Sequence, residues 1–93
     1  MVEFEWDEDK RRSNLRKHGI DFLRAQQLFD GRPVYESSND RHLEIRNLTT
    51  GLIEGKFYTV IWTLREGRVR IISCRRAWDA EERTYRALHG GRD

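Results

Sequence analysis

The second half of the chain is dominated by apolar and β-branched residues that alternate with polar ones. This period of two begins after Pro33 and predicts strands whose side chains point alternately to the two faces of a sheet. Turn-forming pairs interrupt the pattern at Asn39–Asp40, Glu54–Gly55 and Glu66–Gly67. We therefore predict three antiparallel strands joined by tight turns, and a shorter strand before them, over residues 42–53, 56–65, 68–76 and 33–36.

The first third of the chain carries helix signals instead. Asp7 is placed as the N-cap of a charged segment, and Gly19 follows the basic residues that end this segment. Asp21 caps a second helix with apolar residues at helical spacing, which ends at Asp30–Gly31. The two helices are predicted to form an αα-hairpin. Because Leu15 is almost the only apolar residue of the first helix, one whole side of that helix must face water or a partner.

The two ends of the chain complete the order of elements. Phe4–Trp6 predicts a short strand, and Asp79 with Glu82 has the spacing of a capping box for a helix that runs to 88 or 89. We expect residues 90–93 to fray. The resulting order, β-α-α-(β)-β-β-β-α, predicts that the whole chain is one α+β domain with an antiparallel meander sheet of three to four strands.

If the side chains of residues 68–76 alternate strictly, they are divided between the two faces of the sheet. One face is predicted to carry Val69, Ile71, Ser73 and Arg75, and the other Arg68, Arg70, Ile72, Cys74 and Arg76. Each face is then apolar in the middle and basic at its ends.

Composition limits the class of protein. A chain of 93 residues, 37% hydrophobic and 37% charged, forms a small domain with a thin core, so a deep cofactor cleft is not expected. The longest apolar run, residues 57–64, is too short to cross a membrane, and the acidic N-terminus is unlike a secretory signal. We expect a cytoplasmic protein. The single cysteine, Cys74, lies in an apolar stretch and is expected to pack in the interior, as are Trp6 and Trp62.

Positive charge is clustered in two segments. The chain has 15 Arg and three Lys, with five of these cations in residues 10–17 and five Arg in residues 65–76, whereas acids gather in residues 3–9. Because the guanidinium group suits bidentate contact with phosphate, an Arg-rich balance favours a phosphate-bearing partner. Solvated faces of a helix and an edge strand explain the same clusters equally well.

Candidate chemistry is sparse. The three histidines, His18, His42 and His89, stand in separate elements without a second cysteine, so we expect no metal site, and no nucleotide-binding fingerprint occurs. A histidine at a helix C-terminus, as in Lys17–His18–Gly19, is suited to proton transfer, because the helix dipole favours its charged form. The simpler alternative is that His18 only complements the dipole and that Gly19 only caps the helix.

The segment that ends in Arg75–Arg76 is a second candidate site. A strand end next to a helix N-terminus is a favourable place for an anion. Glu81 and Tyr85 lie one turn apart on that helix, where a carboxylate can orient an arginine and a phenol can stack on a base. A surface Glu–Arg pair beside a half-buried tyrosine is an equally good explanation.

Taken together, pieces distributed over nearly the whole chain resemble the BrnT family of toxins. The matching pieces are Phe4–Asp7, Lys10, Asn14, Lys17–Gly19, Phe22, Leu28–Asp30, Arg46 with Gly51, Gly67–Ser73, Arg75–Ala77, Glu81 and Tyr85. The resemblance implies a RelE-like fold, a ribonuclease that arrests growth, and a neutralising antitoxin of the BrnA type with a ribbon-helix-helix DNA-binding end. Operator DNA would be bound only through that antitoxin, and no cofactor or metal is implied.

The resemblance also implies roles for individual residues. Lys17 and His18 would donate or accept protons, Arg46 and Arg75 would bind the scissile phosphate, Glu81 would orient an arginine or take a proton, and Tyr85 would contact a base. The remaining RNA-binding residues would be Lys10, Arg70 and Arg76. RNA can supply its own 2′-hydroxyl nucleophile, so positioned cations suffice to offset the charge that develops on the phosphate.

Two positions depart from the family pattern. Trp78 stands where threonine is usual, and the segment before Arg46 is short, which leaves His42 and Glu44 without an assigned role. Two other functions compete with a ribonuclease. One is a non-catalytic module that binds nucleic acid or protein through the basic segments, and the other is a domain that only binds its antitoxin.

Overall fold

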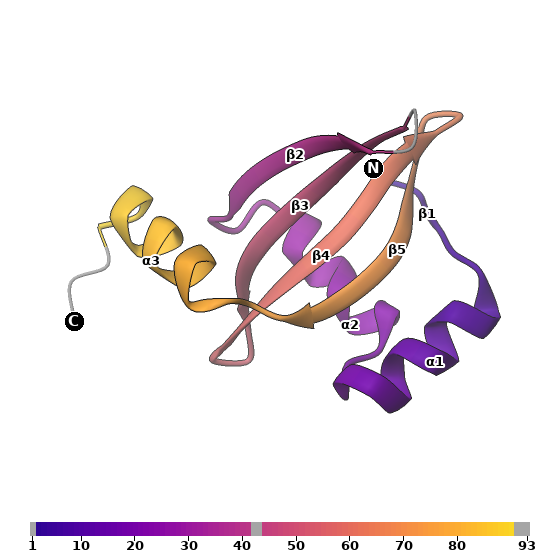
Figure 1. The fold of residues 1–93 in the computed structure, drawn as a ribbon, viewed down its shortest axis with the longest axis horizontal. Helices are drawn as coiled ribbons and strands as arrows, with labels where there is room; N and C mark the ends of the chain where they lie inside the picture. The colour runs from indigo at the N-terminus through magenta and orange to yellow at the C-terminus, as the bar shows by residue number, and fades with distance from the viewer. Residues whose placement is uncertain (1, 42–43, 91–93) are drawn as a thin grey trace.

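A computed structural model describes residues 2–41 and 44–90 of the chain. A five-stranded sheet has the strand order β1-β5-β4-β3-β2, and the helices pack against it (Figure 1). The strands are β1 (Phe4–Glu5), β2 (Tyr35–Arg41), β3 (Glu44–Ile53), β4 (Lys56–Arg65) and β5 (Arg68–Arg76). The helices are α1 (Glu8–His18), α2 (Phe22–Ala25) with the 3-10 turn η1 (Gln26–Phe29), and α3 (Asp79–Leu88). The predicted α+β class is therefore confirmed.

The sheet is mixed, which corrects the predicted antiparallel meander of three to four strands. Strands β2 to β5 do pair antiparallel in sequence order, and β4 and β5 have the predicted bounds. However, β1 adds a fifth strand that runs parallel to β5, with Phe4 opposite Val69. The Phe4 ring packs edge-to-face on Phe29 of η1, with ring centroids 5.3 Å apart, which holds this two-residue strand against the sheet.

Strand β2 is longer than the predicted strand over 33–36. Asn39 and Asp40, which were predicted to form a turn, lie inside β2 opposite Arg46 and Ile45 of β3. Continuous backbone pairing with β3 outweighs the turn preference of these two residues, and polar side chains suit an edge strand. The predicted start of the next strand, residues 42–43, lies outside the described residues.

The N-terminal helices begin where predicted. The Asp7 carboxylate accepts hydrogen bonds from the backbone of Asp9 and Lys10 at 2.8 and 3.2 Å, and Asp21 accepts one from Leu23. Helix α1 ends at Gly19, whose φ of 71° lies in the left-handed region that glycine tolerates. The second helix is shorter than predicted, because it tightens into the 3-10 turn η1 after Ala25.

One face of the sheet is covered by the N-terminal half of the chain. The buried residues on this face form one hydrophobic cluster. Its members are Ile20, Phe22, Ala25 and Leu28 from the N-terminal half and Ile53, Tyr58, Val60, Val69, Ile71 and Cys74 from the strands. Trp6 and Trp62 pack against this cluster, as predicted. Burial raises the pKa of the Cys74 thiol to about 12, so this cysteine packs as a small apolar residue.

A bulge in β5 changes which side chains share a face. Ser73 pairs with Ile61 and Ile71 pairs with Trp62, so Ile72 is an extra residue with no partner in this ladder. The predicted alternation is therefore wrong beyond Ile71. Val69, Ile71 and Cys74 all lie on the covered face, whereas Arg70, Ser73 and Arg75 lie opposite Thr63, Ile61 and Thr59 on the other, open face.

Helices α1 and α3 lie at opposite ends of the molecule (Figure 1). Helix α1 contacts β5, and α3 contacts β2 and β3 at the other end of the sheet. In residues 2–41 and 44–90, no helix is long and apolar enough to cross a membrane.

Candidate functional site

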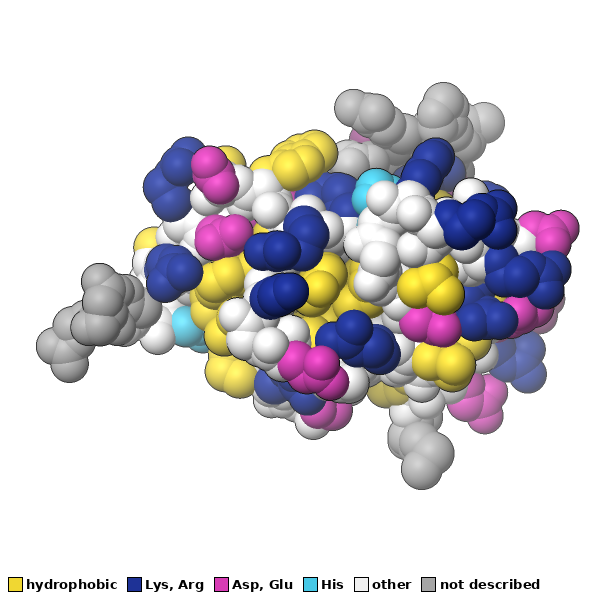
Figure 2. All heavy atoms as spheres, turned by 90° about the horizontal axis from the view of Figure 1, so that it is seen from below, with side chains coloured by type: hydrophobic (Ala, Val, Ile, Leu, Met, Phe, Trp, Pro, Cys, Tyr) yellow, Lys and Arg dark blue, Asp and Glu magenta, His cyan; other side chains and the backbone are white. Residues whose placement is uncertain are grey.

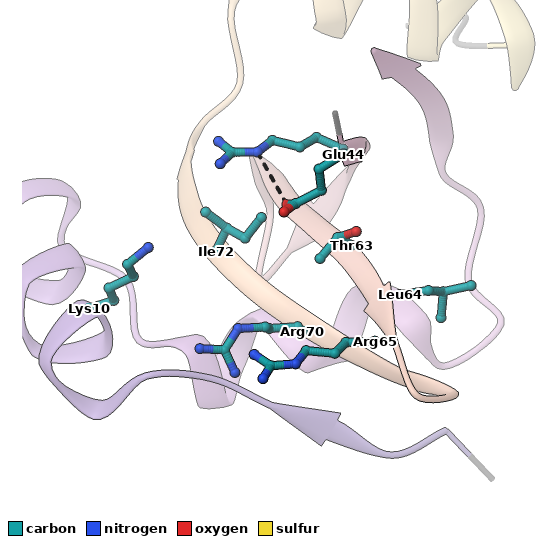
Figure 3. Close-up of a pocket in the computed structure, with 8 residues that line it drawn as sticks. Lys10, Glu44, Thr63, Leu64, Arg65, Arg70 and Ile72 are labelled. Carbon is teal, nitrogen blue, oxygen red and sulfur yellow. Dashed lines mark ion pairs between the residues drawn. The ribbon is translucent and has the colours of Figure 1, made fainter. Parts of the chain in front are cut away.

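A hollow of about 360 Å³ lies on the open face near the β4–β5 turn (Figure 3). Side chains from three strands and from α1 form its walls: Lys10, Glu44, Arg46, Thr63, Leu64, Arg65, Arg70 and Ile72. In Figure 3, Lys10 extends from α1 toward the sheet, and Arg65 and Arg70 lie side by side on neighbouring strands. Residues distant in the sequence thus meet around one basic hollow.

A second hollow, of about 400 Å³, continues the first along α1. Its walls are Asp9, Lys10, Ser13, Asn14, Lys17, His18, Ile72 and Ser73. Lys10 and Ile72 line both hollows. We call the combined depression the basic groove. It brings together five of the predicted site residues, namely Lys10, Lys17, His18, Arg46 and Arg70.

Asn14 fixes α1 beside the sheet and so shapes the basic groove. Its side-chain nitrogen donates to the carbonyls of Cys74 and Ile20 at 2.8 and 3.2 Å, and its oxygen accepts from the Cys74 N–H and the Ser73 hydroxyl, each at 3.1 Å. Strand β1 pairs only with Val69 and Arg70, so the amide of Asn14 satisfies the β5 edge further along. Asn14 is the one buried residue of α1.

Several cations of the groove lack a strong partner. In the described part of the chain, Lys10 and Lys17 have no carboxylate within ion-pair distance. Arg46 Nε is buried without a hydrogen bond, and the nearest carboxylate oxygen, from Glu44, is 3.6 Å away. Figure 2 shows one face of the molecule, on which Lys and Arg side chains, with some Asp and Glu between them, surround exposed hydrophobic atoms. The groove therefore presents charge that an anion can neutralise.

The arginines near the β4–β5 turn are differently placed, because β1 brings acids beside them. Arg68 Nε donates to Glu3 at 3.1 Å, and Arg70 Nη1 donates to Glu5 at 3.0 Å. Arg65 Nε lies 3.9 Å from the same Glu5 carboxylate. The acidic and basic segments that are separate in the sequence thus neutralise each other at this edge, and Arg70 is partly compensated.

Arg75 and Glu81 form a second polar cluster on the open face. Arg75 Nη1 and Nη2 donate to the two oxygens of Glu81, each at 2.9 Å, and Nη1 also donates to the Arg76 carbonyl. The side chains of Arg75 and Glu81 are only 15% and 11% exposed. Glu81 therefore holds the Arg75 guanidinium in place.

Both oxygens of the Glu81 carboxylate accept hydrogen bonds. Besides Arg75, it accepts from the Thr59 hydroxyl at 2.9 Å and from the Trp78 N–H at 2.8 Å, and Thr59 shares a hydrogen bond with Thr50. Burial on its own would raise the pKa of Glu81, but the hydrogen bonds from Arg75, Trp78 and Thr59 outweigh burial and hold the pKa below its ordinary value. Glu81 is therefore a carboxylate that orients other groups.

The Trp78 N–H bond to Glu81 corrects the predicted start of the last helix. Trp78 is the N-cap residue of α3 and Glu81 provides the capping carboxylate, whereas Asp79, the predicted cap, is the first helical residue. Glu81 can close this cap because it already faces Thr59 on β4. The helix ends at Leu88, as predicted.

Arg46 and Arg75 lie on the same face of the sheet. Arg75 pairs with Thr59, Thr59 pairs with Thr50, and Thr50 is four residues after Arg46 along β3. Those four residues span about 13 Å of strand, so the two arginines occupy neighbouring positions on one face and not the same hollow. Ser73, one pleat before Arg75, lines the groove and lies between them.

Tyr85 and Arg76 lie away from the basic groove. Tyr85 packs edge-to-face on Phe57 with centroids 5.0 Å apart and lines a different hollow beside Arg32. Arg76 Nε donates to the Phe57 carbonyl, and Arg76 pairs with the core residue Tyr58, so it faces the covered side. His42 lies outside the described residues, whereas Glu44, which had no assigned role, lines the groove.

Sequence reasoning missed three features of the site. All three depend on contacts between distant segments of the chain. They are the structural role of Asn14, the buried hydroxyls of Thr50 and Thr59, and the bulge at Ile72. Asn14 was among the pieces that resemble the BrnT family, but its hydrogen bonds to β5 could not be predicted from its position in the chain. In residues 2–41 and 44–90 no group of three or more His, Cys, Asp or Glu is arranged to hold a metal ion.

The fold and the groove define a small α+β protein with a surface suited to an anionic polymer. Residues 6–81 match the family model described as the ribonuclease toxin BrnT of type II toxin–antitoxin systems. This match covers most of the chain, which therefore belongs to the BrnT family of ribonuclease toxins, and an antitoxin partner follows from that class. No curated protein matches the chain.

Proposed function

We propose that this protein is an endoribonuclease toxin that cleaves RNA in the basic groove without a metal ion, using the RNA 2′-hydroxyl as the nucleophile. The observation that carries the proposal is the set of weakly paired cations in the groove that also holds His18, above all Arg46, whose buried Nε has no hydrogen bond to a described residue and whose ion pair with Glu44 is 3.6 Å long. A buried N–H without a hydrogen bond is costly, and the Glu44 carboxylate at 3.6 Å is too far to supply one, so an RNA phosphate is an anion that can complete Arg46.

The chemistry requires two proton transfers and stabilisation of negative charge. A bond forms between O2′ and phosphorus while the bond from phosphorus to O5′ breaks, which leaves a 2′,3′-cyclic phosphate and a 5′-hydroxyl. The 2′-hydroxyl loses a proton, and the leaving O5′ gains one. His18 and Lys17 line the end of the groove from α1 and are our candidates for these transfers. Arg46 and Lys10 would offset the charge on the phosphate oxygens.

Arg75 is our candidate for a second phosphate contact. An arginine has five N–H donors, and Glu81 and the Arg76 carbonyl engage three of those of Arg75. Nε–H and one Nη2–H, which form one edge of the guanidinium, have no partner among the described residues. We expect Tyr85 and Arg76 to contact RNA only outside the groove.

We further propose that the partner is a BrnA-type antitoxin with a ribbon-helix-helix end, and that operator DNA is bound only through it. The family supports a type II antitoxin partner. The order of elements in the described residues supports a RelE-like domain, and we propose that it acts in the cytoplasm.

The test is expression of the protein alone and together with the product of the neighbouring gene. We expect expression alone to stop growth and coexpression to restore it. The purified protein should cleave RNA in EDTA and leave 2′,3′-cyclic phosphate ends. Salt-sensitive RNA binding without cleavage would contradict the proposal and favour a binding module. Full activity of an Arg75→Ala variant would remove Arg75 from the site.

A further inference from the structure

Trp78 is a large aromatic residue that the groove does not use. Its side chain is 63% exposed, although tryptophan is usually highly buried. Trp6 and Trp62, in contrast, pack against the core. Trp78 stands at the N-cap of α3, directly beside the Arg75–Glu81 pair.

The Trp78 ring is held in a fixed position. The Arg75 guanidinium lies over it, with the guanidinium carbon 3.8 Å from the ring centroid. Glu81 fixes both partners, since it accepts from the Trp78 N–H and from Arg75. One face of the ring is therefore covered by a cation that cannot easily move, and most of the remaining ring surface is open to solvent. A ligand that stacks there pays little ordering entropy.

We propose that the open face of Trp78 stacks on an unpaired base of the RNA substrate. The free edge of Arg75, formed by Nε–H and Nη2–H, would bind the adjoining phosphate. The open face of the ring can stack on a base, and the two free donors of Arg75 beside it can bind a phosphate. This arrangement matches the base and phosphate of one nucleotide in a single strand. This inference rests on the proposed ribonuclease function and adds that the substrate is single-stranded beside the groove.

The nearby charges favour RNA over an acidic protein segment. The Arg75 guanidinium that covers one face of the Trp78 ring combines positive charge with an aromatic surface, the pattern that single-strand binding surfaces use. An acidic protein segment could pair a carboxylate with the free guanidinium edge, but its acidic side chains have no aromatic plane to stack on the open ring, whereas a nucleotide supplies both a base and an anion.

The test measures binding to a single-stranded 2′-O-methyl oligoribonucleotide, which has no free 2′-hydroxyl and cannot be cleaved by this route. Trp78→Ala should weaken binding about 5- to 150-fold, the loss typical of one base–aromatic stack, and Trp78→Phe should restore most of it. Wild-type tryptophan fluorescence should be quenched by the oligonucleotide, and the quench should disappear in Trp78→Ala. The same sequence as a duplex should bind both proteins equally.

Two outcomes would overturn the inference. One is equal binding of the single strand by wild type and Trp78→Ala. The other is an equal loss for single strand and duplex, which would mean that Trp78 only shields the Arg75–Glu81 pair. If Trp78→Ala keeps single-strand binding but escapes neutralisation by the coexpressed antitoxin, the surface belongs to the protein partner. Cleavage of ordinary RNA by wild type in EDTA, measured in parallel, reports on the proposed function independently.

Discussion

Two groups of cations on the open face of the sheet differ in what surrounds them. At the edge formed by β1 and β5, Arg68 and Arg70 donate to Glu3 and Glu5 at 3.1 and 3.0 Å. In the groove, Arg46 has only a carboxylate 3.6 Å away and a buried Nε without a hydrogen bond in the described part of the chain. Both groups look alike in the sequence, as arginines in strands. The difference arises because β1 folds back beside β5 and does not reach β3.

The comparison teaches that clustered charge is not the same as available charge. An exposed, paired arginine contributes little to stability or binding, because its charge is already offset and water screens the remainder. An arginine without a good partner gains more from an incoming phosphate. Arg75 is intermediate, since Glu81 neutralises its charge but leaves one edge of the guanidinium free.

The largest expected effect is on catalysis by His18. Replacing His18 with Gln removes the proton transfer group but keeps a polar side chain at the end of α1, so the cleavage rate should fall about 100- to 10,000-fold. Single-turnover cleavage of a short RNA measures this effect. His89→Gln is the matched control, because His89 contacts the Val34 carbonyl away from the groove. Equal rates for both variants would remove His18 from the chemistry.

The next effect is on the attachment of α1. Asn14→Ala leaves the N–H and C=O of Cys74 without their side-chain partner, so the free energy of unfolding should fall by about 3 kcal/mol. Urea denaturation measures the change. Ser13→Ala, on the neighbouring and less buried position, should change it by less than about 0.5 kcal/mol. A stable Asn14→Ala variant would mean that α1 is held by other contacts.

A smaller and pH-dependent effect is expected at Glu81. Its pKa in the folded protein lies below the ordinary value of 4.5. The ionised carboxylate therefore stabilises the folded protein fully above about pH 4.5, and this stabilisation is lost as the pH falls through the pKa of the folded protein. Glu81→Gln should cost about 2 kcal/mol at neutral pH, because it leaves the half-buried Arg75 without its counter-charge. The difference in the free energy of unfolding between Glu81→Gln and wild type should become smaller below pH 4.5. Denaturation curves with the same gap at both pH values would contradict this account.

The smallest effect is expected at the neutralised edge. Arg68 and Glu3 are 48% and 69% exposed, so Arg68→Ala should change the free energy of unfolding by no more than about 0.5 kcal/mol. Thermal denaturation in low and high salt measures it. A loss well above 1 kcal/mol would show that this edge is not merely a solvated ion pair.

Local signals predicted much of this fold. These signals depend only on neighbouring residues: the N-caps Asp7 and Asp21, the left-handed Gly19, and the turns at Glu54–Gly55 and Glu66–Gly67. The structure contains each helix or strand that these signals delimit. Gly19, Gly55 and Gly67 have a positive φ, which glycine adopts at little cost, whereas Glu54 and Glu66 also have a φ of 52° in their turns.

Non-local contacts set the rest of the fold and the site. The parallel pairing of β1 with β5 joins residues more than sixty positions apart, and the bulge at Ile72 reverses the faces of Cys74 and Arg75. Strict alternation would have put Arg70 and Arg75 on opposite faces, whereas the bulge puts both on the open one. Which arginines have only weak partners follows from this strand pairing and cannot be seen in the charge pattern alone.

The most direct test of the central claim is a comparison of Arg46→Ala with Arg68→Ala in cleavage of the same RNA in EDTA. If weakly paired groove cations carry the reaction, Arg46→Ala should lose about 100- to 1,000-fold in rate with unchanged thermal stability, and Arg68→Ala should cleave like wild type. Equal rates for the two variants would contradict the account.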